Sequence, residues 1–98
     1  MNNMVNERYK KKLIEIIKKY LPDCKIYLYG SRARGDFSQG SDIDLCIDAG
    51  KKIDFRILGD MKEEIEESTI PLFVDVVDYH EISEEFKNNI MKDAILWQ

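Results

Sequence analysis

The stretch that decides the fold is residues 30–45, which read GSRARGDFSQGSDIDL. It follows a run at 25–29 that is rich in aromatic and β-branched residues and therefore predicts a β-strand. The glycine breaks that strand, and the serine after it is a residue type that caps helices, which predicts a short helix over 31–37. Residues 38–41 are typical of a turn, and a second strand is expected over 42–48.

Two aspartates, Asp42 and Asp44, stand two positions apart at the start of this second strand. Because strand side chains alternate between faces, both carboxylates should project together while Ile43 and Leu45 point into a core. Two carboxylates this close repel each other unless a cation lies between them. Mg²⁺ prefers oxygen ligands of this kind and keeps other positions for water and phosphate. A solvent-facing acidic strand edge is the alternative interpretation of the pair taken alone.

The Gly30-Ser31 pair predicts an anion-binding turn. A glycine at a strand end lets the backbone turn tightly and approach a ligand closely. The following helix N-terminus presents unpaired N–H groups and the positive end of its dipole, and Ser31 adds a hydroxyl donor. A capped helix after a tight turn is the alternative, but it does not explain the acidic pair that follows. Together the two motifs indicate metal-dependent chemistry on a nucleoside triphosphate.

A third carboxylate is expected near such a site, because two-metal phosphoryl transfer needs a further group beside the nucleophile. Asp75 is the preferred candidate, since it sits within the apolar run 73–77, where a lone charge is costly unless it is paired or metal-bound. Asp78 is its rival, but an offset of three residues puts it on the opposite face, at a strand end where acids are easily solvated. Asp48 shares a face with Asp44 but lies roughly 13 Å further along the strand, too far for the same metal.

Two arginines and the single histidine are weaker candidates. Arg34 is a candidate for contact with phosphate and Arg32 for contact with a partner, although simple solvation is the alternative for both. Gly35 is expected to let the chain leave the short helix. His80 follows a strand and is expected to be a surface or loop residue, because nothing in the sequence pairs it with a serine or cysteine nucleophile.

Periodicity predicts three longer helices and one more strand in the rest of the chain. The helices are expected over 6–21, 55–67 and 83–96, with Asp54 as the cap of the second and Ser83 as the start of the third, and the strand over 72–78. The order is then αβαβαβα in one domain over residues 1–98. The expected fold class is α/β (α+β), a small mixed sheet of about three strands with helices packed on it. So small a sheet should leave an edge or an apolar helix face exposed for a partner.

Composition limits the class of protein and the kind of partner. The chain has 98 residues with 15 basic and 19 acidic side chains, and this acidic balance argues against a large nucleic-acid interface. No stretch approaches the roughly 20 apolar residues of a membrane span, and no signal peptide is evident. Cys24 and Cys46 are expected to be free buried thiols in a reducing compartment. These features predict a cytoplasmic protein.

The combined motif resembles that of a known family. Gly30-Ser31, ten residues, then Asp42-x-Asp44, with a distal Asp75 in an apolar strand, is similar to the DNA polymerase β-type nucleotidyltransferase superfamily. Within it, the short chain and the run GSRARGDFSQGSDIDL resemble the minimal nucleotidyltransferases, called MNT. The match covers roughly residues 25–78 and is much more specific as a whole than any of its parts.

The resemblance implies a nucleotidyltransferase fold and a role for each motif residue. Gly30 and Ser31 would bind the triphosphate of ATP, and Asp42 and Asp44 would ligate two Mg²⁺ ions. Asp75 would ligate the catalytic metal and help to deprotonate the attacking hydroxyl. MNT proteins resemble the antitoxin halves of toxin–antitoxin pairs whose toxins are helical HEPN ribonucleases. The implied reaction is transfer of AMP from ATP to a hydroxyl of that partner, a tyrosine, with release of pyrophosphate.

Two other functions stay open at this point. The chain could neutralise its toxin by binding alone, with a vestigial acidic triad, or it could act on a small molecule or an RNA end. The acidic balance disfavours RNA. All three acidic positions are occupied, which favours catalysis, and the absence of a second domain for the acceptor suggests that a partner protein completes the site.

Overall fold

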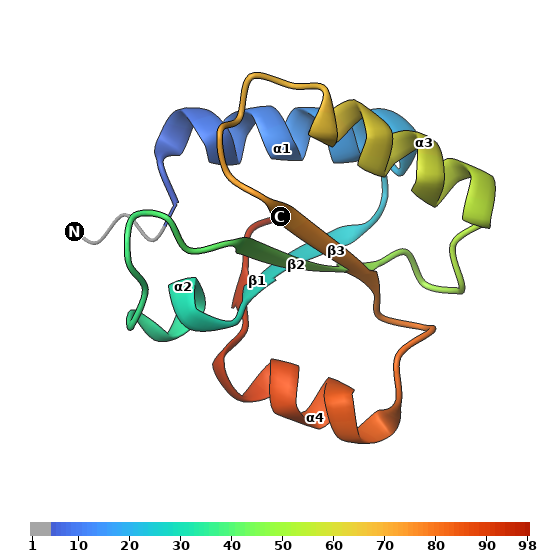
Figure 1. The fold of residues 1–98 in the computed structure, drawn as a ribbon. Helices are drawn as coiled ribbons and strands as arrows, with labels where there is room; N and C mark the ends of the chain where they lie inside the picture. The colour runs from blue at the N-terminus through green and yellow to red at the C-terminus, as the bar shows by residue number, and fades with distance from the viewer. Residues whose placement is uncertain (1–4) are drawn as a thin grey trace.

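Helices and strands alternate along the chain in the computed structural model, which describes residues 5–98 (Figure 1). The elements are α1 (Glu7–Tyr20), β1 (Lys25–Tyr29), α2 (Ser31–Arg34), β2 (Ile43–Asp48), α3 (Phe55–Glu66), β3 (Val74–Asp78), α4 (Glu84–Asp93) and β4 (Ile95–Leu96). Asp54 caps α3 as predicted, because its side chain accepts a hydrogen bond from Arg56 N (2.8 Å), and Ser83 caps α4 in the same way by accepting from Phe86 N (3.1 Å).

The strands form one mixed sheet in the order β3-β2-β1-β4. β1 runs antiparallel to both β2 and β4, whereas β2 and β3 are parallel. The predicted mixed sheet with packed helices is therefore confirmed, with four strands in the described residues in place of about three. The parallel pair matters most for function, because it brings the N-terminal ends of β2 and β3 to the same end of the sheet.

The fourth strand lies in a segment for which the sequence predicts helix. The last helix ends at Asp93, Ala94 is extended (φ −63°, ψ 142°), and β4 pairs with β1. Trp97 continues the pairing, since its N–H donates to Ile26 O at 2.7 Å. Pairing with the free edge of β1 outweighed the helical periodicity of the sequence, as tertiary contacts often do. The short helix α2 is also shorter than predicted, because Gly35 adopts a left-handed conformation (φ 88°) directly after Arg34.

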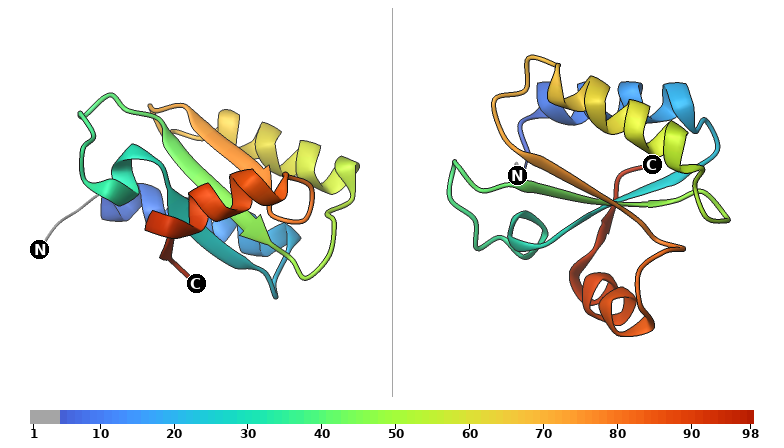
Figure 2. Two further views of the ribbon diagram at one scale, coloured as in Figure 1. Left: turned by 90° about the horizontal axis from the view of Figure 1, so that it is seen from below. Right: turned by 45° about the vertical axis from the view of Figure 1, so that its right-hand side comes forward.

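Helices cover both faces of the sheet (Figure 2). α1 and α3 pack on one face, over a core to which β2 contributes Ile43, Leu45 and Ile47, all fully buried. The smaller cluster on the opposite face, under α4, contains Cys46. The prediction that Ile43 and Leu45 point into the core is confirmed, and it follows that Asp44 projects to the α4 side of the sheet.

Both cysteines are buried free thiols, as predicted. Burial raises the pKa of the Cys46 thiol to about 12, so it stays protonated and behaves as an apolar core residue. No helix within residues 5–98 has the length and apolar character needed to cross a membrane.

Several large apolar side chains remain exposed, in line with the expectation of an open surface. The most exposed are Phe55 (78%), Phe73 (65%) and Leu96 (54%). Phe73 directly precedes β3, an edge strand of the sheet, so an apolar side chain and an unpaired strand edge lie next to each other.

Candidate active site

Asp44 occupies the central position of the candidate site. In the sheet register it lies opposite Asp75 on β3 and opposite Tyr29 on β1. Residues paired across neighbouring strands share a face and are separated by about 5 Å. The structure therefore brings Asp44 and Asp75 together on the α4 side of the sheet, both half-buried. Their roles as ligands remain predictions.

Gly30 lies against the Asp44 carboxylate. Its backbone has φ 78° and ψ −157°, a conformation that is essentially limited to glycine. A Cβ added at this position would collide with Oδ2 of Asp44, so the carboxylate would have to shift. Gly30 O accepts hydrogen bonds from the N–H groups of Ala33 and Arg34, both at 3.1 Å, which begins α2. The turn predicted to bind phosphate thus lies directly against Asp44, one member of the acidic pair.

Asp42 is exposed and lies directly before β2, which begins at Ile43. Burial raises the pKa of Asp44 above its ordinary value, and the negative charges of Asp75 and Asp42 raise it further. The guanidinium of Arg34 acts in the opposite direction. Repulsion among the three carboxylates is therefore only partly compensated by the protein, and a bound cation would relieve it.

The carboxylates have the donor chemistry that Mg²⁺ requires. Within residues 5–98 no group of three His, Cys, Asp or Glu side chains comes together closely enough to hold a metal ion. Mg²⁺ does not need one, since it usually binds one or two carboxylates and takes its remaining ligands from water and substrate phosphates. Asp44 and Asp75, in register on neighbouring strands, supply carboxylate oxygens of this kind beside the Gly30 turn, and the role of Asp42 as a ligand remains a prediction.

The two arginines of α2 differ in environment. Arg34 is exposed, and its Nε donates to Oδ2 of Asp36 at 3.3 Å, so its predicted contact with phosphate stays a prediction. Arg32 is buried, with 4% of its surface exposed, and its guanidinium contacts backbone carbonyls of the following loop. Both expectations for Arg32, a partner contact or simple solvation, are therefore wrong. No sequence pattern indicates this burial, because the partners are backbone atoms.

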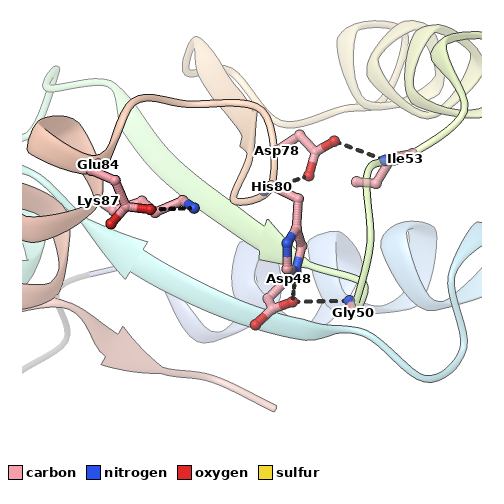
Figure 3. A network of polar contacts seen from close by, with 7 residues as sticks. All are labelled: Asp48, Gly50, Ile53, Asp78, His80, Glu84 and Lys87. Atoms are coloured by element: carbon pink, nitrogen blue, oxygen red, sulfur yellow. Dashed lines mark hydrogen bonds and ion pairs between the residues drawn. The ribbon is translucent and has the colours of Figure 1, made fainter.

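Asp78 is part of a separate network at the far end of the sheet (Figure 3). It is buried rather than solvated, which corrects the expectation for a strand end. Its Oδ2 accepts from Ile53 N at 2.8 Å and its Oδ1 from His80 N at 3.0 Å. These backbone donors replace water, which explains how the carboxylate is tolerated inside. Asp78 lies on the opposite face from Asp75, as predicted, and takes no part in the candidate site.

Asp48 and His80 form a contact in the same network (Figure 3). His80 lies in the turn after β3 as expected, and its Nε2 is 2.7 Å from Oδ1 of Asp48. The same oxygen accepts from Gly50 N at 2.9 Å. Burial alone would raise the pKa of Asp48, but the hydrogen bonds from Gly50 and His80 hold it below its ordinary value. The sequence did not reveal this pair because its members come from different strand ends.

Sequence reasoning also missed a pair of aromatic residues beside the carboxylates. Tyr29 is buried on the face of Asp44, and its ring meets that of Phe86 edge-on with centroids 6.0 Å apart. Burial, followed by the charges of Asp75 and Asp44, raises the pKa of the Tyr29 hydroxyl well above its usual range. Its position directly before Gly30 is the signal that sequence reasoning could have used.

The chain matches a known family over most of its length. The family described as "Polymerase beta, Nucleotidyltransferase" matches residues 11–97. A curated relative from Haemophilus influenzae, "Probable protein adenylyltransferase MntA", is 34% identical over 83 residues, which cover 85% of this chain and 73% of the relative.

Solved structures share the fold. A toxin–antitoxin crystal structure with AMP-PNP superposes with a TM-score of 0.75 at 24% identity, covering 89% of this chain and 70% of that one. A complex of tri-AMPylated Shewanella oneidensis HEPN toxin with MNT antitoxin gives 0.72 at 21% identity, covering 92% and 69%. These likenesses confirm the nucleotidyltransferase fold that the motif implies.

Proposed function

Because the chain belongs to the polymerase β-type nucleotidyltransferase family, as a minimal nucleotidyltransferase, we propose that it transfers AMP from ATP to a hydroxyl of a HEPN toxin. The acceptor is a tyrosine of that toxin, and the modification is the means by which the chain acts as an antitoxin. The observation that carries this proposal is the register of β2 and β3, which places Asp75 beside Asp44 with Gly30 against the same carboxylate.

The relatives support the choice of nucleotide and partner. The Haemophilus influenzae protein is named a probable protein adenylyltransferase, and one solved toxin–antitoxin complex contains AMP-PNP. Another contains an AMPylated HEPN toxin bound to its MNT antitoxin. ATP and an intracellular ribonuclease toxin are both present in the cytoplasm, and we therefore propose that the activity takes place there. Residues 1–98 act in it as one minimal catalytic domain.

The nucleotide binds at the end of β1. The turn at Gly30 places the N-terminus of α2 beside Asp44, and backbone N–H groups there and the Ser31 hydroxyl donate to phosphate oxygens. Arg34 lies close enough to lower the pKa of Asp44 and adds a positive charge on the same side. Its ion pair with Asp36 is exposed and therefore weak, so it can be exchanged for phosphate.

The three carboxylates would hold the metal. Asp42, Asp44 and Asp75 would ligate two Mg²⁺ ions, which would neutralise charge on the phosphates and lower the pKa of the acceptor hydroxyl. The half-buried position of Asp44 and Asp75 limits competition from water and strengthens their interaction with a cation.

The transfer is an in-line displacement at the α-phosphorus of ATP. Asp75 accepts the proton of the acceptor hydroxyl. The hydroxyl oxygen forms a bond to the α-phosphorus while the bond to the bridging oxygen breaks, and pyrophosphate leaves with that electron pair. The products are AMP esterified to the acceptor and free pyrophosphate, so no other co-reactant is needed.

The acceptor reaches the site from a protein surface that contacts the exposed apolar residues around it. Phe73 precedes the strand that carries Asp75, and Phe86, 38% exposed, lies on Tyr29 beside Asp44. Apolar and aromatic side chains of this kind are enriched at protein interfaces. A docked partner thereby brings its hydroxyl to Asp75.

The direct test is a labelling assay with purified components. The chain is incubated with its cognate HEPN toxin, ATP labelled at the α-phosphate, and Mg²⁺, and the toxin is then analysed by mass spectrometry. We expect label on a toxin tyrosine. No transfer, under conditions where the two proteins are shown to bind, would refute the proposal.

The double variant Asp42→Asn/Asp44→Asn separates catalysis from neutralisation by binding alone. We expect it to bind the toxin and fail both to label and to neutralise it. Neutralisation by a variant that cannot transfer AMP would favour the binding mechanism.

A further inference from the structure

Arg32 is buried in α2 with its guanidinium directed at the loop that joins α2 to β2. Its Nε donates to Ser41 O at 3.1 Å, and its Nη2 donates to Ser41 O at 3.0 Å and to Gln39 O at 2.9 Å. The ring of Phe37 lies 4.8 Å from Cζ, over the guanidinium. A buried charge is tolerated only when its donors are satisfied, so this loop and Arg32 depend on each other.

The loop itself closes into a turn directly before Asp42. Ser41 N donates to Ser38 O at 3.1 Å, and Ser38 N donates to the Ser41 hydroxyl at 3.0 Å. The carbonyl that receives two bonds from Arg32 belongs to the peptide group between Ser41 and Asp42. The guanidinium therefore holds the backbone at the point from which the Asp42 side chain projects.

The sheet does not hold Asp42 in the way it holds the other carboxylates. Asp44 lies on β2, which pairs with β1 on one side and β3 on the other, and Asp75 lies within β3. The ladder between β2 and β3 begins one residue after Asp42, where Ile43 N donates to Phe73 O at 2.9 Å. Asp42 thus depends on the preceding turn for its direction.

We propose that Arg32 is a positioning residue, which fixes the turn at 38–41 so that Asp42 points toward Asp44 and the phosphates. The role rests on the proposed function, in which Asp42 is a metal ligand. Arg32 itself touches neither nucleotide nor acceptor. Its effect is on the affinity of the site for Mg²⁺ and not on the contacts of the Gly30 turn with phosphate.

Lysine cannot make the contacts of Arg32, so the variant Arg32→Lys tests the role of the guanidinium directly. The planar guanidinium reaches two carbonyls at once with fixed geometry, whereas an ammonium on a flexible stem is a single point charge. Arg32→Lys keeps the charge and most of the apolar stem. It separates a role in geometry from a role in electrostatics alone.

The first experiment measures AMP transfer as a function of Mg²⁺ concentration. We expect Arg32→Lys to raise the half-saturating Mg²⁺ by about 10–100-fold, the effect typical of groups that orient metal ligands. At saturating Mg²⁺ the rate should recover and the KM for ATP should stay within about 2-fold of wild type. An unchanged Mg²⁺ dependence in the folded variant would overturn the proposal.

A matched control tests whether a general loss of stability causes the shift in Mg²⁺ dependence. Ile65→Val shortens a core residue of α3 without touching the turn. At a temperature where both variants are folded, this change should lower Tm without shifting the Mg²⁺ dependence. A similar shift in Ile65→Val would mean that Arg32 acts only through global stability.

The second experiment does not need activity. Hydrogen exchange of the Ser38 and Ser41 amides should be faster by about 10-fold or more in Arg32→Lys, as local opening becomes easier, while the Leu28 and Leu45 amides in the sheet stay protected. Unchanged hydrogen exchange at Ser38 and Ser41 would refute the proposal that Arg32 fixes the turn. If wild type transfers no AMP, the proposed function fails, yet this measurement still decides whether Arg32 fixes the turn.

A milder variant covers the case in which Arg32→Lys does not fold. Phe37→Leu removes the ring over the guanidinium but leaves the hydrogen bonds in place. It should shift Mg²⁺ dependence and exchange in the same direction by a smaller factor. No shift in either quantity would contradict the proposal.

Discussion

Asp44 on β2 and Asp75 on β3 lie opposite each other in a parallel register that the hydrophobic core determines. Ile43, Leu45 and Val76 are buried on the face covered by α1 and α3, so the intervening aspartates must project to the other face. A slip of one residue in β3 would bury Asp75 and expose Val76. The packing that stabilises the sheet therefore also assembles the carboxylates.

Replacement of Asp44 by asparagine should abolish transfer and stabilise the fold. Loss of a metal ligand removes several kcal/mol of transition-state stabilisation, or about 100-fold or more in kcat/KM. In EDTA the variant should have a higher Tm than wild type, because a half-buried charge that repels Asp42 and Asp75 is gone. Labelling assays and calorimetry measure the two effects.

Ligand binding provides the control for this variant. Wild type should gain thermal stability from Mg²⁺ and ATP together, by mass action, and Asp44→Asn should gain much less. A variant that keeps both the transfer rate and the ligand-dependent shift would contradict the assignment of Asp44.

Gly30→Ala should damage both stability and activity. The backbone at Gly30 has a positive φ that costs about 1–3 kcal/mol for other residues, and the added methyl would collide with the Asp44 carboxylate. We expect a lower Tm and at least about a 10-fold lower rate, since a displaced metal ligand costs one or more orders of magnitude.

Gly59→Ala is the matched control for this change. Gly59 lies within α3, and a Cβ there meets no atom within 4 Å. Alanine should stabilise the helix by about 0.5–1 kcal/mol and leave the transfer rate unaltered. Equal losses of activity in the two variants would show that the position of Gly30 beside Asp44 is unimportant.

Much of the fold could be predicted from periodicity and from residues with special backbone roles. The alternation around Ile43 and Leu45 predicted which face of β2 is buried, and Gly30 marked the end of β1. The local pattern failed at 95–96, because a strand of two residues has no period of its own and forms only when β1 offers an edge.

The sequence indicated the candidate residues whose side chains carry the chemistry, but it did not indicate contacts made by backbone atoms. Spacing indicated Asp42 and Asp44, and the apolar run 73–77 indicated Asp75, which the structure places in register with Asp44. Arg32 was misjudged because its partners are carbonyls, which every residue has and no sequence pattern reveals. Asp78 was expected in solvent for the same reason, since backbone N–H groups satisfy it.

The Asp48–His80 contact predicts a pH-dependent contribution to stability. The pKa of Asp48 is lower in the folded protein than its ordinary value of about 3.9, so its stabilising effect is present above that pH and disappears as pH falls through the folded pKa. Asp48→Asn should cost about 0.5–1.5 kcal/mol at pH 7, or a few degrees in Tm. The difference from wild type should shrink below about pH 4.

Asp23→Asn changes an exposed aspartate that directly precedes Cys24 and serves as the control. Thermal unfolding followed from pH 3 to pH 7 should show a Tm difference of nearly zero for this variant, as is usual for surface substitutions. A Tm difference for Asp48→Asn that persists unchanged into acid would contradict an electrostatic role for the carboxylate.

Exposed phenylalanines at the two ends of the sheet should differ in their effect on partner binding. Phe73 is 65% exposed and lies at the N-terminal end of β3, the end that carries Asp75. Phe55 is 78% exposed but begins α3, beyond the C-terminal end of β2. Because β2 and β3 are parallel, the two rings are at opposite ends of the sheet.

Phe73→Ser should therefore weaken the complex with the HEPN toxin, whereas Phe55→Ser should not. Loss of a large aromatic contact at an interface costs about 1–3 kcal/mol, which is about 5-fold to 150-fold in Kd. Both substitutions remove an exposed ring from the surface, so each should leave the free energy of unfolding within about 0.5 kcal/mol of the wild-type value. Calorimetric titration of the toxin measures the two affinities. Equal affinities of the two variants would place the toxin elsewhere on the protein, whereas a selective loss at Phe73 would place it beside Asp75.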